Sequence, residues 1–492
     1  MIRFLILLFI LFLQACSPTS DTKTNNYSWT FLLFQENGDP GFRENKNENE
    51  NENENLDFFV SQNSILFREN LGNLDWTLMI GSPSVLTMRP KLAIDGGGSI
   101  YIAADIDAGI DRDPLQDEPQ NNSIKGIRDL VLGKYDSQKK TIWAKQVGAP
   151  GTTLNVSGLA VDRNGNAYVT GSIVGVFEDV PVGGKKDLFL VKFAPDGSLV
   201  WKKQTGPSGR NYDVSPEKIA VDTFGNSYIV GTSDGPFGGS AEKHGNGFII
   251  KFDTDGNQLW VKQLSIRDAA IFPMGVAFDK VTGRIYMVGY GNANFETESF
   301  PGIGYNNFFI LKYDGDGNGQ FFAQLGVASK RMGAYSVAVD LSGNVFAGGT
   351  SDANFDPEAV GSGFLGTLVK YNSSGVQQWV RQFGPFVGRK NTVIQAMATD
   401  KVGNVFTTGW SNGNIMDEGD NSIGSADVFL TKYDPFGQNE WKRQIGTAGV
   451  RMSGNGIEID LEGNLYCAGW TTGAVNEIPV TGNRDLFLMK FN

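Results

Sequence analysis

The sequence predicts an all-β fold, a seven-bladed β-propeller of four-stranded antiparallel blades, and two observations lead to it. An aspartate before a tight turn recurs at intervals of about 60 residues, at Asp95, Asp162, Asp222, Asp279, Asp340, Asp400 and Asp460. A fixed period of this length is typical of a solenoid or a propeller. The 63 glycines are too many for a helical protein and suit short strands joined by tight turns.

Residues 1–15 are predicted to be a lipoprotein-type signal peptide. Arg3 precedes an apolar run over 4–13, which is too short to span a bilayer but suits a signal-peptide core. The run ends in Leu13-Gln14-Ala15-Cys16, which resembles a lipobox, although Gln14 departs from its commonest pattern. The resemblance implies cleavage before Cys16 and acylation of Cys16, and an ordinary secretory signal is the alternative.

Residues 16–73 are predicted to form a low-complexity polar tether that begins with the lipidated cysteine. Over 44–55, Glu and Asn alternate almost without interruption, so this tract has high charge and no apolar content to bury. We expect acyl chains to hold the protein on a membrane of the cell envelope, at the outer membrane or the cell surface.

Each repeat within residues 74–492 is predicted to supply four strands. The first ends at the aspartate, and Asp-x-x-Gly-Asn is a hairpin turn in which Asp caps backbone amides and Gly supplies positive φ. The second strand is typified by 166–171 and the fourth by 201–206, which begins with Trp. The third, typified by 187–193, is apolar on both faces and therefore needs cover on each side, as a sheet between two neighbours would have.

The two ends of this region are predicted to share one blade. The chain ends at residue 492, at the end of a third strand, so the last blade lacks its fourth. Residues 75–81 read as a fourth strand with no blade before it. We expect this N-terminal strand to complete the last blade, which would close the ring and remove both sheet edges.

These motifs resemble the SBBP family, the bacterial β-propeller repeats. The matching features are the Ala-Val-Asp-x-x-Gly-Asn-x-Tyr-Val-x-Gly core, the Asp-x-Phe-Leu-x-Lys strand and the Trp-x-x-Gln-x-Gly strand, which recur over residues 74–492. The resemblance implies a propeller on an exported or surface protein. It implies no particular reaction, because the family offers no shared catalytic residues to carry over.

Charge and histidine content exclude several classes of function. A net charge of −12 argues against nucleic acid or anionic lipid as the main partner. His244 is the one histidine, so a zinc site with several His ligands is impossible and a Ser-His or Cys-His nucleophile could use only His244. No P-loop or dinucleotide fingerprint occurs, and we expect no cofactor.

Cations shortly before the first strand of five repeats are the first candidate ligand site: Arg210, Arg267, Arg331, Arg389 and Arg451. On the face that carries the longer loops they would surround the channel mouth and could bind an anion or an acidic glycan. The alternative is that each arginine pairs with a carboxylate of the next blade.

Two acidic features are further candidates. Glu458 stands where the other six repeats have Ala, two residues before the aspartate, and would either face the channel as a site residue or pair with a neighbouring cation. The loop 105–128 carries Asp105, Asp107, Asp111 and Asp113, which are weak candidates for calcium because the EF-hand pattern is absent. An acidic solvated loop is the alternative.

These observations favour a non-catalytic binding module, a monomer that engages an unidentified protein or glycan at the envelope. One alternative is a polysaccharide hydrolase or lyase that uses carboxylates on the loop face. Another is a structural spacer within the envelope.

Overall fold

The computed structural model describes residues 74–81, 88–107, 125–177, 184–207, 211–237, 246–264, 266, 268–292, 305–357, 361–385, 388–416, 423–480 and 483–492. The expected signal peptide, Cys16 and the polar tether lie outside these ranges. Within them all regular structure is β, and no helix that could cross a membrane is found there.

The described ranges contain 28 strands. In chain order they are β1 (Leu74–Ile80), β2 (Met88–Ile94), β3 (Ile100–Ile106), β4 (Asp129–Tyr135), β5 (Thr141–Val147), β6 (Thr153–Val161), β7 (Ala167–Val174), β8 (Asp187–Phe193), β9 (Leu199–Thr205), β10 (Val214–Val221), β11 (Ser227–Ser233), β12 (Asn246–Phe252), β13 (Gln258–Leu264), β14 (Ile271–Asp279), β15 (Arg284–Gly291), β16 (Asn307–Tyr313), β17 (Gly319–Leu325), β18 (Met332–Val339), β19 (Val345–Ser351), β20 (Ser362–Tyr371), β21 (Gln377–Phe383), β22 (Arg389–Thr399), β23 (Val405–Ser411), β24 (Asp427–Tyr433), β25 (Asn439–Ile445), β26 (Met452–Ile459), β27 (Leu465–Thr471) and β28 (Asp485–Phe491).

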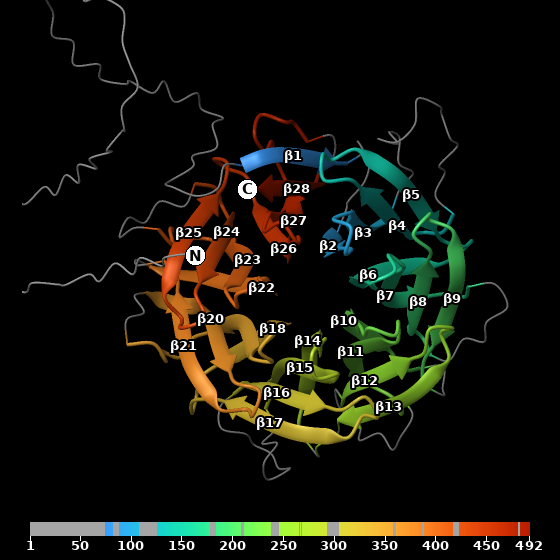
Figure 1. The fold of residues 1–492 in the computed structure, drawn as a ribbon, viewed down its shortest axis with the longest axis horizontal. Coiled ribbons are helices and arrows are strands. Elements are labelled where there is room, and N and C mark those ends of the chain that lie inside the picture. The colour runs from blue at the N-terminus through green and yellow to red at the C-terminus, as the bar shows by residue number, and fades with distance from the viewer. Residues whose placement is uncertain are drawn as a thin grey trace, which may run out of the picture. The chain divides into compact units, whose positions relative to one another are not determined.

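These strands form an all-β, propeller-like arrangement of four-stranded antiparallel sheets. The sheets β2–β5, β6–β9, β10–β13 and β14–β17 each pair their strands in chain order. The groups β18–β21 and β22–β25 repeat this order and are joined by a short parallel contact of β20 with β22. Strands β2, β6, β10, β14, β18, β22 and β26 lie innermost around a common axis (Figure 1).

The N-terminal strand completes the C-terminal sheet, whose order is β1-β28-β27-β26. Strand β1 runs antiparallel to β28, with Leu78 opposite Leu488. The Trp76 Nε1–H group then donates to the Ser137 carbonyl of the β4–β5 turn, at 3.1 Å. Equivalent bonds join other neighbouring sheets, from Trp143 to Pro195, from Trp201 to Thr254, from Trp260 to Gly315 and from Trp379 to Pro435. The contact between the last sheet and the first is therefore of the same kind as those between sheets that the chain joins covalently.

The recurring aspartate organises the turn between the first two strands of each sheet, as the sequence predicts. In the β6–β7 turn, Asp162 Oδ1 accepts from the amides of Asn164 and Asn166, both at 2.9 Å. Its Oδ2 accepts from the Asn166 side chain and from the Tyr168 hydroxyl. Gly165 has a φ of 83°, in the left-handed region that glycine tolerates. The motif is thus a structural cap rather than a ligand site.

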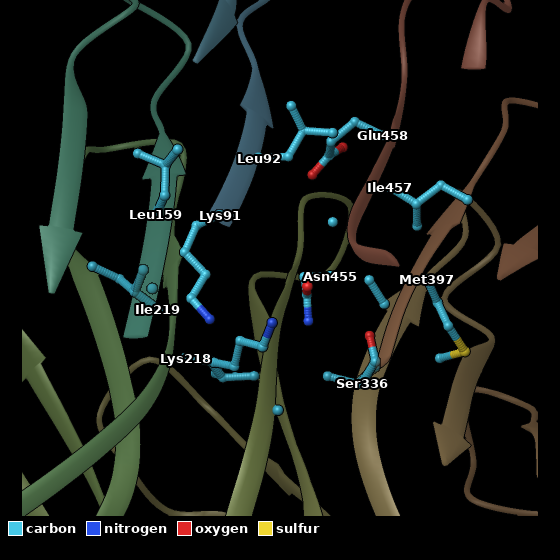
Figure 2. A pocket seen from close by; sticks show the side chains of 16 residues that line it. Lys91, Leu92, Leu159, Lys218, Ile219, Ser336, Met397, Asn455, Ile457 and Glu458 are labelled. Carbon is cyan, nitrogen blue, oxygen red and sulfur yellow. The ribbon is translucent and has the colours of Figure 1, made fainter. Parts of the chain in front are cut away.

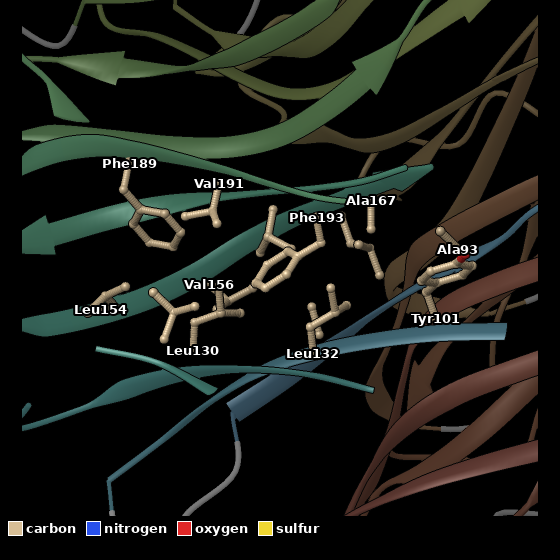
Figure 3. Packing of buried hydrophobic residues seen from close by; sticks show 14 of the residues in the cluster. Ala93, Tyr101, Leu130, Leu132, Leu154, Val156, Ala167, Phe189, Val191 and Phe193 are labelled. Atoms are coloured by element: carbon tan, nitrogen blue, oxygen red, sulfur yellow. The ribbon is translucent and has the colours of Figure 1, made fainter. Parts of the chain in front are cut away.

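Apolar side chains fill the space between adjacent sheets (Figure 3). On β8, Phe189 and Val191 belong to the cluster shared with β2–β7, while Leu188 and Leu190 belong to the cluster shared with β10–β12. Alternate residues of one strand therefore enter two different cores, which explains why the third strand is apolar on both faces.

Candidate functional site in the axial channel

A cavity of about 130 Å³ lies between the innermost strands, and all seven of them contribute to its lining. The lining is mainly apolar or small, with polar groups from four strands (Figure 2). The lining residues are Lys91, Leu92, Gly158, Leu159, Lys218, Ile219, Gly275, Val276, Ser336, Val337, Ala396, Met397, Asn455, Gly456, Ile457 and Glu458.

A β-bulge sets which side chains reach this cavity. The register with the second strand shifts at the same place in every innermost strand, for example between Pro216 and Lys218 on β10 and between Val156 and Gly158 on β6. A bulge of this kind bends the strand and redirects the side chain that follows it. The residue after the bulge is the fourth before the turn aspartate in each repeat.

At this position five strands carry a small residue and two carry lysine. The small residues are Gly158, Gly275, Ser336, Ala396 and Gly456, and the exceptions are Lys91 on β2 and Lys218 on β10. Added bulk would collide with a neighbour, since a Cβ on Gly158 would come within 2.8 Å of Ile219 Cγ2. The two lysines therefore project into space that small residues leave open.

Burial lowers the pKa of both lysines. Their side chains are partly accessible to solvent through the cavity, and protein surrounds the rest of each side chain. Burial lowers the pKa of Lys91 to about 7, and the nearby Lys218 charge lowers it further than Glu217 can offset. Burial likewise lowers the pKa of Lys218. Among the described residues, no ion pair includes either lysine.

The predicted site residue Glu458 lines the same cavity. Its carboxyl group lies near Leu92 in Figure 2. Burial raises the pKa of Glu458 to about 7, and the charges of Lys280 and Lys218 counteract this only in part. No ion pair of the described residues includes Glu458, so its position is that of a channel-lining group.

Asn455 supplies an unusual polar group to the lining. This side chain is 7% exposed. One end of its amide contacts the Gln395 amide at 2.5 Å, and the other end has no hydrogen-bond partner among the described residues. A buried polar atom without a partner is costly, and such an atom in a cavity wall points to an occupant that is missing from the protein itself.

Three of the five predicted arginines fall within the described residues. Arg331, Arg389 and Arg451 lie at or next to the first residues of β18, β22 and β26, and their side chains are exposed. Arg210 and Arg267 lie outside the described ranges. The Arg331 amide donates to the Asp352 carboxylate at 2.7 Å, a contact of the backbone and not of the guanidinium.

Additional arginines lie beside Arg451 at the rim. The Arg484 guanidinium stacks over the Trp470 ring, with 4.1 Å from Cζ to the ring centre. Burial lowers the pKa of Arg484, and the charges of Arg451 and Arg89 lower it further. Three guanidinium groups therefore share this part of the rim, between the sheet of β26–β28 and β2.

Of the four aspartates proposed as calcium ligands, the structure describes Asp105 and Asp107. Asp105 is buried, lies 3.7 Å from Arg128 Nη1 and accepts from the Val156 amide. Burial raises the pKa of Asp105 to about 6. Asp107 also has interactions, whereas Asp111 and Asp113 lie outside the described residues. In the part of the chain that the structure describes, no three acidic, His or Cys side chains are grouped as metal ligands.

A second hollow, of about 480 Å³, lies on the face of the short turns. It is formed by the turns that follow β14, β18, β22 and β26. Its rim carries exposed apolar side chains: Val281, Leu341, Val402 and Leu461. The sequence analysis placed ligand sites on the opposite face, and no sequence motif distinguishes these turn residues from ordinary turn residues.

A family model described as a β-propeller repeat, SBBP, matches residues 142–178, 200–238, 259–296, 320–356, 378–415 and 440–475. The chain contains six SBBP β-propeller repeats. Each SBBP match starts in the outermost strand of one sheet and ends after the second strand of the next. The match over 200–238, for example, runs through β9, β10 and β11.

Similar proteins outside the family model are distant. The regulatory protein FlaEY of Caulobacter vibrioides is 30% identical over 182 residues, which cover 34% of this SBBP chain and only 18% of FlaEY. A chain of the Mitotic Checkpoint Complex is 9% identical with a TM-score of 0.48, over 86% of this chain and 94% of that one. The polysaccharide lyase Uly1 is 10% identical with a TM-score of 0.41, over 84% and 90%. At these scores neither likeness bears on what this chain does.

Proposed function

We propose that this SBBP protein is an exported, lipid-anchored binding module that engages a protein or glycan at the cell envelope and catalyses no reaction. The supporting observation is the narrowness of the axial channel. Its cavity of about 130 Å³ is well below the range of roughly 300–1,000 Å³ that small-molecule sites occupy. Among the described residues Glu458 is the one carboxylate in its lining, whereas glycoside hydrolysis uses two flanking the scissile bond. The hollow of about 480 Å³ on the face of the short turns falls within that range, but its aspartates Asp340, Asp400 and Asp460 accept hydrogen bonds within their own turns.

We also propose that the sheets form a closed ring of seven blades, with β1 as the closing strand. The pairing of β1 with β28 and the bond from Trp76 to Ser137 support this proposal. The cavity that strands from all the sheets line together supports it as well. A closed ring would present its loops on one shared face, which is the surface that the binding role requires.

The anchor is proposed from the sequence of residues 1–16. Radiolabelled palmitate supplied to growing cells should be incorporated into the protein and lost in Cys16→Ser. Proteolysis of intact cells would then show whether the anchored chain is exposed at the surface.

The binding role is tested with the Cys16→Ser chain, which removes the acylation site. We expect it to be retained on an array of envelope proteins and glycans and to release no product from polysaccharides. Catalytic cleavage of any polysaccharide would overturn the proposal. It would also be overturned if the chain bound nothing on the array and a deletion strain had an unchanged envelope composition.

A further inference from the structure

We propose that Lys91 and Lys218 hold a small tetrahedral oxyanion such as hydrogen phosphate inside the axial channel. The anion would be free in solution or the end group of a longer ligand. This site goes beyond the binding role proposed above and does not rest on it, because an inorganic anion can enter the channel whether or not the loop face binds a macromolecule.

The geometry of the two lysines carries the proposal. They extend from β2 and β10, and the strand between them, β6, has only Gly158 at the matching position. Figure 2 shows that both ammonium groups extend into the cavity that Asn455 also lines. Two cations that enter one cavity of about 130 Å³ leave room there for one small group.

Charge selects an anion for this gap. Two ammonium groups brought together in a largely apolar cavity repel each other, because low local polarity strengthens their interaction. Glu217 attracts both lysines, Glu458 attracts Lys218 and Asp105 attracts Lys91, but none of these carboxylates forms an ion pair with either lysine in the described structure. An anion bound between the two nitrogens would replace the repulsion with charge-assisted hydrogen bonds.

Asn455 and Ser336 supply polar partners for the anion. Both line the cavity, and the end of the Asn455 amide that faces away from Gln395 is buried without a partner. Hydrogen phosphate carries both acceptor oxygens and a hydroxyl donor, so it can satisfy an amide in either orientation as well as the lysines.

A basic path connects the rim to the site. Arg451 and Arg484 lie at the rim with Arg89, and Arg89 also acts electrostatically on Lys91 and Lys218. In a chain with a net charge of −12, the three arginines and the two lysines form a local group of five cations. Such a path attracts anions and raises their local concentration at the cavity entrance.

The experiment is a calorimetric titration of the full chain in detergent with inorganic phosphate, in a phosphate-free buffer of low ionic strength. We expect saturable binding to the parent. Lys91→Met and Lys218→Met should each weaken it by about 10-fold to 100-fold, the loss typical of one hydrogen bond to a charged group. Lys262→Met, at an exposed position on β13, is the matched control and should bind like the parent.

Two further arms identify the anion and its source. Sulfate should compete with phosphate, as expected of a site for tetrahedral oxyanions, and a failure to compete would overturn the assignment of the two lysines as an oxyanion site. A hexose 6-phosphate that competes with phosphate would identify the anion as an end group, whereas phosphate binding without such competition would identify a free ion.

Thermal unfolding without phosphate shows whether the variants are folded. Each lysine variant should unfold at or above the temperature of the parent, because it removes a repulsive pair. The proposal is overturned if the parent shows no saturable phosphate binding, or if both folded lysine variants bind phosphate as tightly as the Lys262 control.

Discussion

Replacing Trp76 tests how much the contact between the first and last sheets contributes. Trp76→Phe keeps a ring against Tyr466, whose centroid lies 6.2 Å away, and removes only the bond to the Ser137 carbonyl. Trp76→Ala removes the ring as well. Trp201→Phe and Trp201→Ala are matched controls, because Trp201 makes the same kind of bond to Thr254 between sheets that the chain joins covalently.

The magnitudes follow from one hydrogen bond and one half-buried ring. Losing the hydrogen bond should cost about 1 kcal/mol. Losing the ring of a fully buried Trp costs about 3–5 kcal/mol, and Trp76 is only partly buried, so about 2–3 kcal/mol is expected for Trp76→Ala. For a unit of this size 1 kcal/mol moves the Tm by only about 1–2 °C, so thermal unfolding alone is a weak measure.

Native-state hydrogen exchange is the sharper assay, because it reports local opening. In Trp76→Ala the amides of β28 that pair with β1 should exchange about 30-fold to 150-fold faster, which corresponds to 2–3 kcal/mol of local stability. In Trp201→Ala the acceleration should be confined to β8 and β9 and should be smaller, since the chain itself keeps that strand in place.

The reasoning is refuted if Trp76→Ala leaves the exchange of the β28 amides unchanged. It is also refuted if the acceleration in Trp76→Ala is no larger than in Trp201→Ala, because β1 would then need no contact with the neighbouring sheet to stay paired.

Three further predictions concern the turn and the channel. Asp162→Ala removes the acceptor of two amides and two side-chain donors and should lower the free energy of unfolding by about 2–4 kcal/mol in urea titration, with a smaller loss for Asp196→Ala in an exposed turn. Burial raises the pKa of Glu458 from 4.5 to about 7, so its stabilising contribution is present below pH 4.5 and is lost as the pH rises through 7. Glu458→Gln should therefore be as stable as the parent near pH 4 and more stable than the parent at pH 8 in urea titrations. Burial lowers the pKa of Lys91 from 10.5 to about 7, so its cost grows as pH falls from 10.5 to 7; Lys91→Met should gain more stability at pH 6 than at pH 10, and an equal gain at both values would contradict the shift.

The strands and turns were predictable because their signals are local and repeated. Asp162 with Gly165 specifies a turn by itself, and the recurrence of the same pattern locates the equivalent strands along the chain. The partner of β1 was predictable from what each end of the chain lacked, and its pairing with β28 is present.

The channel site was only half predictable. Glu458 was found because it breaks the alanine pattern two residues before the aspartate. Lys91 and Lys218 break an equally regular pattern of small residues four before the aspartate, and aligning that position would have found them. The simple alternation of side chains along a strand does not predict where these lysines point. The reason is the β-bulge before them, which shifts that alternation by one residue.

Each SBBP match begins and ends within a sheet and not at its boundary, and this affects how a gene for such a chain can gain or lose repeats. A match that runs through β9, β10 and β11 contains the outer strand of one sheet and the inner half of the next. The match omits the third strand, β12, so a duplication of a whole unit would have to run from β9 through β12. Such a copy would carry the junction between two sheets together with its Trp donor, and the gene could lengthen or shorten by such units without leaving a sheet incomplete.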